Sequence, residues 1–129
     1  RQVEREGGEA IEGPLDGEEG ITLLADLDAG ARGSMTSGMI VDQIKPVITH
    51  HLAGRTQAAV SAYARVLPAI NHENRQCGWR SCKAAMVEGG VIASEFCRHP
   101  IEPLHPAVRA RLIDLLLPLE PVVLTWGRT

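Results

Sequence analysis

Aromatic residues are scarce in this sequence: they make up 3% of its 129 residues, whereas hydrophobic residues make up 44%. A core must therefore be built from Leu, Ile, Val, Ala and Met. Because aromatic and β-branched side chains dominate β-sandwiches, this composition favours packed helices. The length fits one ordinary domain, and a charged fraction of 22% is typical of a globular chain, not a disordered one.

Other absences exclude several partners and locations. The net charge is −3, so the chain lacks the excess of positive charge that nucleic-acid binding requires. No apolar run reaches the roughly 18–20 residues that span a bilayer, and the charged start over 1–9 lacks the apolar core of a signal peptide. Three cysteines, an odd number, indicate a reducing compartment. We therefore expect a cytoplasmic protein that binds neither nucleic acid nor a membrane.

Hydrophobic periodicity and turn residues divide the chain into short elements. The expected elements are a strand over 9–13, a helix over 18–29, a strand over 31–37, and helices over about 40–52, 59–70, 78–88 and 108–116. We expect Pro46 either to kink its helix or to restart it, and Pro68 to kink the next one. No internal repeat or low-complexity tract interrupts this pattern.

The order strand, helix, strand predicts a βαβ unit and hence a parallel sheet. Two parallel strands alone are not stable, because such sheets need more strands and cover on both faces. The chain also begins without Met, and its first residues are typical of the end of an amphipathic helix. A fragment of a larger protein is the simpler interpretation.

Acidic residues follow the first expected strand. Glu18 and Glu19, with Asp16 just before them, either are solvated acids in the first turn of a helix or bind a polar substrate group, since parallel α/β folds build their sites at the carboxyl ends of strands. Neighbouring helical residues diverge by about 100°, so Glu18 and Glu19 are not expected to face one pocket. Which of the three acids faces a site stays open.

Hydroxyl groups mark the end of the second expected strand. Thr36 and Ser37 lie where this strand opens into the next loop, and they either contact an oxygen-rich substrate or act as ordinary strand-end caps. The glycines before them, Gly30 and Gly33, fit the spacing of neither a P-loop nor a dinucleotide-binding fingerprint.

Metal-binding and nucleophilic sites are poorly supported. Cysteine and histidine spacings do not match a zinc site; the residues concerned are His72, Cys77, Cys82, Cys97 and His99. Both lysines, Lys45 and Lys83, are expected on solvated helix faces and not at a strand end, where a Schiff-base lysine would be held. We therefore assign no metal ligand and no nucleophile in this chain.

Five segments in this order resemble the end of the barrel enzymes of the dihydrodipicolinate synthase and N-acetylneuraminate lyase family: IEGPLDGEE, AGARGSMTSG, LPAINHENRQCG, KAAMVEGGVI and RHPIEPLHP. The similarity covers about residues 8–128. Within the family, residues 16–38 and the closing Leu124–Arg128 are most similar to the branch that dehydrates 2-keto-3-deoxy-L-arabonate.

The resemblance implies an α/β fold: residues 1–53 would form the last two βα units of a (β/α)8 TIM barrel, and residues 54–129 a C-terminal three-helix extension. It implies a class I mechanism in which a lysine on the sixth strand, upstream of this chain, forms an imine with a 2-oxo acid. The parent enzyme would be a homo-oligomer, often a tetramer, with no metal or organic cofactor. This chain alone would then hold no catalytic residue and be inactive.

The same resemblance assigns substrate contacts residue by residue. Gly13 matches the family glycine at the end of the seventh strand, and Met35 matches the apolar residue beside the imine. Ser37, with its neighbour Thr36, matches a contact to the hydroxylated end of the substrate, and Asp16 joins them as a βα-loop acid.

The expected reaction is dehydration to 2-oxoglutarate semialdehyde. Aldol cleavage and dihydrodipicolinate synthesis use the same iminium and stay open as alternatives. The alternative from another class of function is a helical interaction module without catalytic activity.

Overall fold

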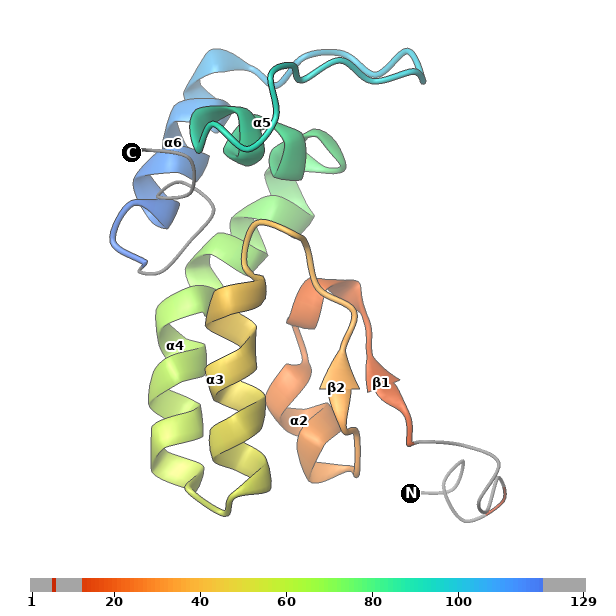
Figure 1. Cartoon of the computed structure of the whole chain (residues 1–129), viewed down its shortest axis with the longest axis vertical. Helices are drawn as coiled ribbons and strands as arrows, with labels where there is room; N and C mark the ends of the chain where they lie inside the picture. Colours follow the sequence, from red (N-terminus) through yellow and green to blue (C-terminus); the bar gives the residue numbers. More distant parts are fainter. Residues whose placement is uncertain (1–5, 7–12, 120–129) are drawn as a thin grey trace.

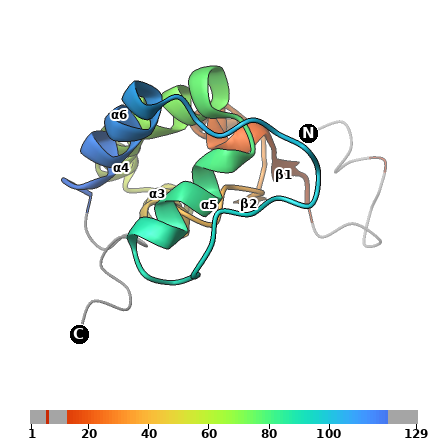
Figure 2. The same cartoon turned by 90° about the horizontal axis from the view of Figure 1, so that it is seen from above.

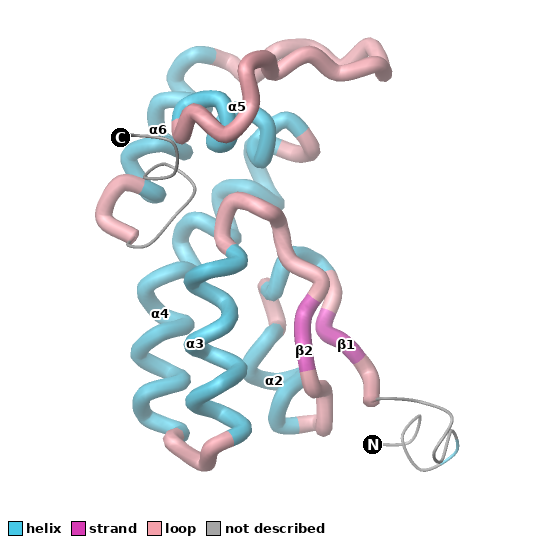
Figure 3. Tube along the Cα trace, viewed as in Figure 1, coloured by secondary structure: helices cyan, strands magenta, loops and turns pink. Residues whose placement is uncertain are grey.

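The computed structural model describes residue 6 and residues 13–119 (Figure 1). Its elements are β1 (Leu15–Asp16), the 3-10 turn η2 (Glu18–Gly20), α2 (Leu23–Asp28), β2 (Gly33–Ser34), α3 (Val41–Leu52), α4 (Thr56–His72), the π-helical turn η3 (Glu73–Cys77), α5 (Arg80–Glu88) and α6 (Pro106–Leu116). Helix predominates in this part of the chain, beside a small sheet of two strands (Figure 3). None of the described helices is long and apolar enough to cross a membrane.

The two strands pair in parallel, as the βαβ pattern predicted, with Leu15 opposite Gly33 and Asp16 opposite Ser34. The strand predicted over 9–13 lies outside the described residues apart from its last one. That residue precedes β1 and belongs to no strand. The strand predicted over 31–37 is correct in place but shorter, because only two of its residues find partners on β1.

The helix predicted over 18–29 is wrong in its first turn. Glu18, Glu19 and Gly20 have positive φ angles of 49°, 63° and 91°, so the chain turns there and the α-helix begins only at Leu23. Positive φ is uncommon for residues other than glycine and marks places where the surroundings hold the backbone. The turn η2 is therefore a defined loop at the end of β1, not the start of a helix.

Both long helices contain an internal proline. Helix α3 continues through Pro46 and helix α4 continues through Pro68, so neither residue starts a new helix. A proline removes one backbone hydrogen bond, and the packing of these helices compensates for that loss. Pro106 is the first residue of α6, where the Nδ1 atom of His105 accepts a hydrogen bond from the backbone N–H of Ala107 at 3.3 Å.

The small sheet has one covered and one uncovered face. Asp16 and Ser34 share the covered face, where Asp16 is 2% exposed. On the other face, Leu15 is 55% exposed and Met35, which follows β2, is 63% exposed. The sheet therefore has an apolar face without cover among the described residues.

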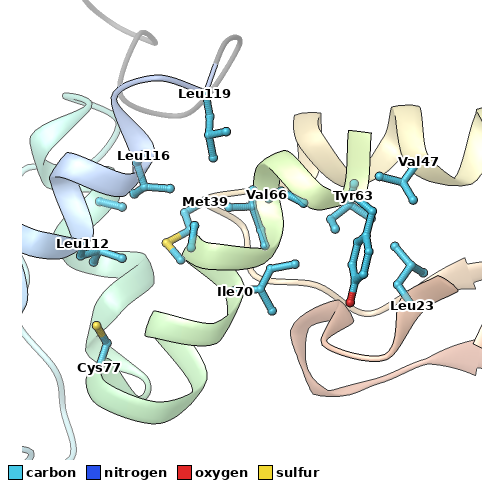
Figure 4. Close-up of a cluster of buried hydrophobic side chains, with 14 of the residues drawn as sticks. Leu23, Met39, Val47, Tyr63, Val66, Ile70, Cys77, Leu112, Leu116 and Leu119 are labelled. Atoms are coloured by element: carbon cyan, nitrogen blue, oxygen red, sulfur yellow. The ribbon is translucent and has the colours of Figure 1, made fainter. Parts of the chain in front are cut away.

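One hydrophobic core joins the helices. Figure 4 shows it running from Leu112 and Leu116 on α6, past Ile70 on α4, to Leu23 on α2. The apolar stripes predicted for α4 and α6 supply much of it, but Leu52 at the end of α3 is 61% exposed. On α5, Ala85 is fully buried, whereas Cys82 and Met86 are partly buried.

Candidate functional site

A cavity of about 380 Å³ lies where the chain leaves the carboxyl ends of both strands. Seen together, Figures 1 and 2 show that β1 and β2 point toward the end of the molecule that carries α5. The walls come from the loops after both strands, from η3 and from the start of α5. The residues lining the cavity are Glu19, Thr36, Ser37, Gly38, Glu73, Asn74, Gly78, Trp79 and Cys82. This is the end of a parallel sheet at which α/β proteins bind their ligands.

Glu73 is the most deeply buried acid in the cavity wall, with 5% of its surface exposed. Its Oε1 atom accepts a hydrogen bond of 2.9 Å from the hydroxyl of Ser81 on α5, and that hydroxyl also lies 2.7 Å from the carbonyl oxygen of Gly78. The second carboxyl oxygen, Oε2, is buried without a hydrogen-bond partner. An unpaired buried oxygen is costly, so a hydrogen-bond donor that reached Oε2 would relieve this cost.

Two further buried oxygens in the same wall have no partner: Oε2 of Glu19 and Oγ of Ser37. Ser37 is 8% exposed. Its neighbour Thr36 donates a hydrogen bond of 3.1 Å to the carbonyl oxygen of Glu19, which ties the loop after β2 to the turn after β1. The side-chain amide of Asn74 reaches the same turn, donating to the carbonyl oxygen of Glu18 at 3.2 Å. The cavity therefore offers unpaired oxygens on a fixed frame.

The surroundings of Glu73 favour the protonated form of its carboxyl group more than water does. Burial raises the pKa of its carboxyl, and the negative charge of Glu19 raises it further, whereas the hydroxyls of Ser81 and Ser37 lower it. Ser37 thus lies close enough to favour the carboxylate, although it makes no hydrogen bond of good geometry with it. Burial and the charge of Glu73 also raise the pKa of the Cys77 thiol to about 11, so this cysteine stays protonated at neutral pH.

The structure brings together only some of the residues predicted as a site. Thr36 and Ser37 line the cavity, and so does Glu19, which settles which of the three acids faces it. Glu18 points to solvent. Asp16 lies beneath the sheet instead, where its carboxylate accepts hydrogen bonds from Ser34 at 2.5 Å and Thr22 at 3.4 Å.

Two other predicted contacts lie away from the cavity. Met35 is exposed on the uncovered face of the sheet. Gly13 precedes β1, so the glycine at the carboxyl end of this strand is Gly17. Pairing with β2, which no local pattern encodes, fixes where β1 ends.

Sequence reasoning missed Glu73 and Ser81. A signal was available, because Glu73 continues the apolar stripe of α4, three residues after Ile70 and seven after Val66, both fully buried. An acid on the buried face of a helix needs a partner or a function. Its importance depends on Ser81 and Ser37, which only the tertiary fold brings to it.

Neither lysine lines the cavity. Lys45 is exposed on α3, and the Nζ atom of Lys83 donates a hydrogen bond to the carbonyl oxygen of Phe96. Within the described residues, no group of three or more His, Cys, Asp or Glu side chains is arranged to hold a metal ion. The cavity offers oxygen acceptors and hydroxyls, and its chemistry suits a hydroxylated small molecule.

Comparison with known proteins places this fold in a class. The structure superposes on dihydrodipicolinate synthase from Rhodopseudomonas palustris with a TM-score of 0.76 and 25% sequence identity, over 92% of this chain and 40% of that protein. The chain therefore has the fold of part of a dihydrodipicolinate synthase, a TIM-barrel enzyme.

In sequence, it is 55% identical over 127 residues to L-2-keto-3-deoxyarabonate dehydratase from Azospirillum brasilense, which covers 98% of this chain and 41% of that enzyme. Searched against protein-family models, the chain matches none. The resemblance seen in the sequence is confirmed in both fold and sequence. The chain spans about two fifths of the length of each relative.

Proposed function

We propose that this chain is the closing part of a class I lyase that dehydrates 2-keto-3-deoxy-L-arabonate to 2-oxoglutarate semialdehyde. The observation that carries the proposal is the 55% identity over 127 residues with a protein named L-2-keto-3-deoxyarabonate dehydratase. The fold alone does not choose between dehydration and aldol cleavage, because one fold hosts many chemistries. The cavity supports a hydroxylated substrate, as a sugar acid is.

In this proposal residues 1–53 belong to the seventh and eighth βα units of the barrel, and residues 54–129 form its helical extension. The parallel pair of β1 and β2 supports this assignment, as do the helices that follow each strand. The uncovered face with Leu15 and Met35 supports it as well, since the other strands of a barrel would cover these side chains. Met35 then packs beside the imine, and Gly17 takes the strand-end place that was expected for Gly13.

The chemistry would divide between two parts of the enzyme. A lysine on the sixth strand, outside this chain, forms an imine with the keto group, and the iminium stabilises the electron pair left when the C3 proton departs. This chain binds the hydroxylated end of the substrate. Glu19 and Ser37 present unpaired buried oxygens to the cavity, and Thr36 holds the Glu19 turn in place. Because hydroxyl groups both donate and accept, they satisfy these oxygens.

Borohydride trapping tests the lyase. With the full-length protein and 2-keto-3-deoxy-L-arabonate, we expect a reduced adduct on one lysine, detected as a mass increase, and 2-oxoglutarate semialdehyde as the product in untrapped reactions. The 129-residue chain alone should form no adduct, since neither of its lysines lines the cavity. Pyruvate and glycolaldehyde as products would identify an aldolase. Absence of any adduct in the full-length protein would leave the non-catalytic alternative.

A pair of neighbouring substitutions tests the binding role of Glu19. We expect Glu19→Gln in the full-length enzyme to raise KM roughly tenfold to hundredfold, as the loss of a hydrogen bond to a charged group implies. Glu18→Gln is the matched control, because Glu18 also has positive φ and lies on the same turn but points to solvent. Steady-state kinetics with both variants decide the point. Equal KM values would place the substrate elsewhere.

A further inference from the structure

Among the acids of the cavity wall, Glu73 has the features of a proton donor. It is the first residue of η3, the turn that follows α4, and 5% of its surface is exposed. Ser81 donates a hydrogen bond to its Oε1 atom, Oε2 is buried without a partner, and Glu73 is one of the residues that line the cavity. A carboxyl that accepts a hydrogen bond on one oxygen keeps its own proton on the other. In its protonated form, Glu73 therefore carries the proton on the oxygen that lacks a protein partner.

We propose that Glu73 is the acid that protonates the departing hydroxyl group when water leaves the substrate. This inference rests on the proposed dehydratase function and adds a catalytic residue to it. Hydroxide is a poor leaving group, so its departure needs a proton at the moment the C4–O bond breaks.

Each bond and proton in this step is accounted for. A base elsewhere in the enzyme takes the C3 proton, and the electron pair of the C3–H bond forms the double bond between C3 and C4. The C4–O bond breaks, and its electrons leave with oxygen. That oxygen takes the proton from Oε2 of Glu73 and departs as water. Glu73 remains as a carboxylate and regains a proton from solvent, so the step requires no oxidant or reductant.

The surroundings of Glu73 fit an acid that is neutral before the reaction. Burial and Glu19 both raise its pKa, so this carboxyl keeps its proton to higher pH than a solvated glutamate does. The titratable groups that face it are Glu19 from η2, Cys77 from its own turn and Cys82 from α5. When Glu73 becomes a carboxylate, Ser81 and Ser37 are close enough to stabilise the new charge, because their hydroxyls lower its pKa.

Glu73→Gln is the first test, made in the full-length enzyme. We expect kcat to fall about a hundredfold to ten-thousandfold, the range for loss of a general acid. Adduct formation under borohydride should persist, because the imine forms elsewhere. A substrate analogue with fluorine in place of the C4 hydroxyl should lose far less rate, since fluoride departs without needing a proton. Glu102→Gln, at an exposed acid, is the matched control and should leave kcat unchanged.

The pH profile of kcat gives a second, independent readout. An acid must be protonated to act, so activity falls as pH rises through the pKa of Glu73. Ser81→Ala removes a hydrogen bond that lowers this pKa, and the alkaline limb should move to higher pH. Glu19→Gln removes a charge that raises it, and the limb should move to lower pH. Opposite shifts in the two variants are not expected from a purely structural role.

The outcomes separate this inference from the proposed function. If the unmodified full-length enzyme traps no adduct and forms no semialdehyde, the dehydratase proposal fails. If it dehydrates its substrate and a folded Glu73→Gln variant keeps the kcat of the unmodified enzyme, with or without a rise in KM, then Glu73 is not the acid. The dehydratase proposal still stands in that case. Should Glu73→Gln not fold, the opposite pH shifts of the other two variants decide: finding them supports the acid, and their absence rejects it.

Discussion

Ile70→Ala is expected to lower the free energy of unfolding by roughly 2–5 kcal/mol, as large-to-small substitutions in a packed core do. Ile70 is fully buried on α4, in the middle of the core between the leucines of α6 and Leu23 on α2 (Figure 4). Truncation there removes apolar contacts and leaves a cavity that rigid helices cannot fill. Urea-induced unfolding followed by circular dichroism measures the change.

A matched substitution on the same helix provides the control. Val60 lies ten residues earlier on α4, and 41% of its surface is exposed. Val60→Ala should change the free energy of unfolding by less than about 0.5 kcal/mol, as exposed substitutions usually do. A loss of equal size in both variants would mean that burial of Ile70 does not govern the stability of α4, because Ala has a higher helix propensity than either Ile or Val.

Tyr63→Phe is expected to cost about 1–3 kcal/mol, the penalty for leaving buried carbonyl groups without their donor. The hydroxyl of Tyr63 lies 3.0 Å from the carbonyl oxygen of Gly20 and 2.6 Å from that of Ile21 (Figure 4). These bonds attach α4 to the turn η2, which carries Glu19 to the cavity. Thermal or urea unfolding gives the stability, and KM of the full-length enzyme reports whether the turn has moved.

The pH dependence of Tyr63→Phe has a defined sign. Burial raises the pKa of the Tyr63 hydroxyl above its usual value of 10.0, and the negative charge of Asp16 adds to the effect. The unfolded chain therefore loses this proton at lower pH than the folded chain does, and the native protein loses stability as pH rises above about 10. The Tyr63→Phe variant has no such proton. The difference in free energy of unfolding between it and the unmodified protein should therefore shrink above that pH. A difference that stays constant up to pH 11 would mean that Tyr63 is not buried as described.

The helices of this protein could largely be predicted from its sequence. Helical periodicity is a local property, since each residue of α3, α4, α5 and α6 makes its backbone hydrogen bonds within four residues along the chain. The apolar stripe of α4 with Ala59, Tyr63, Val66 and Ile70 is therefore visible in the sequence, and all four are buried. Of the two outcomes expected at Pro46, the restart of a helix is wrong, because α3 runs through this residue.

The strands and the site were predictable only in part. The chemical nature of Thr36, Ser37 and Glu19 made them candidates, and their position after parallel strands indicated which end of the sheet to consider. The limits of β1, by contrast, depend on pairing with β2 across 18 residues of chain. For that reason Gly13 was placed at the wrong end of the strand, and Asp16 was expected in a loop although it is buried beneath the sheet.

The sequence by itself determined the composition of the core, the main helices, and the order of segments that relates the chain to a lyase. Only the tertiary structure decided which acid faces the cavity, because Glu18 and Glu19 differ in nothing but the direction their backbone gives them. It alone brought Glu73 to Ser37 across 36 residues and to Ser81 on the next helix. The environment of a buried carboxyl is set by residues distant in the chain, and no local pattern records which of them will meet.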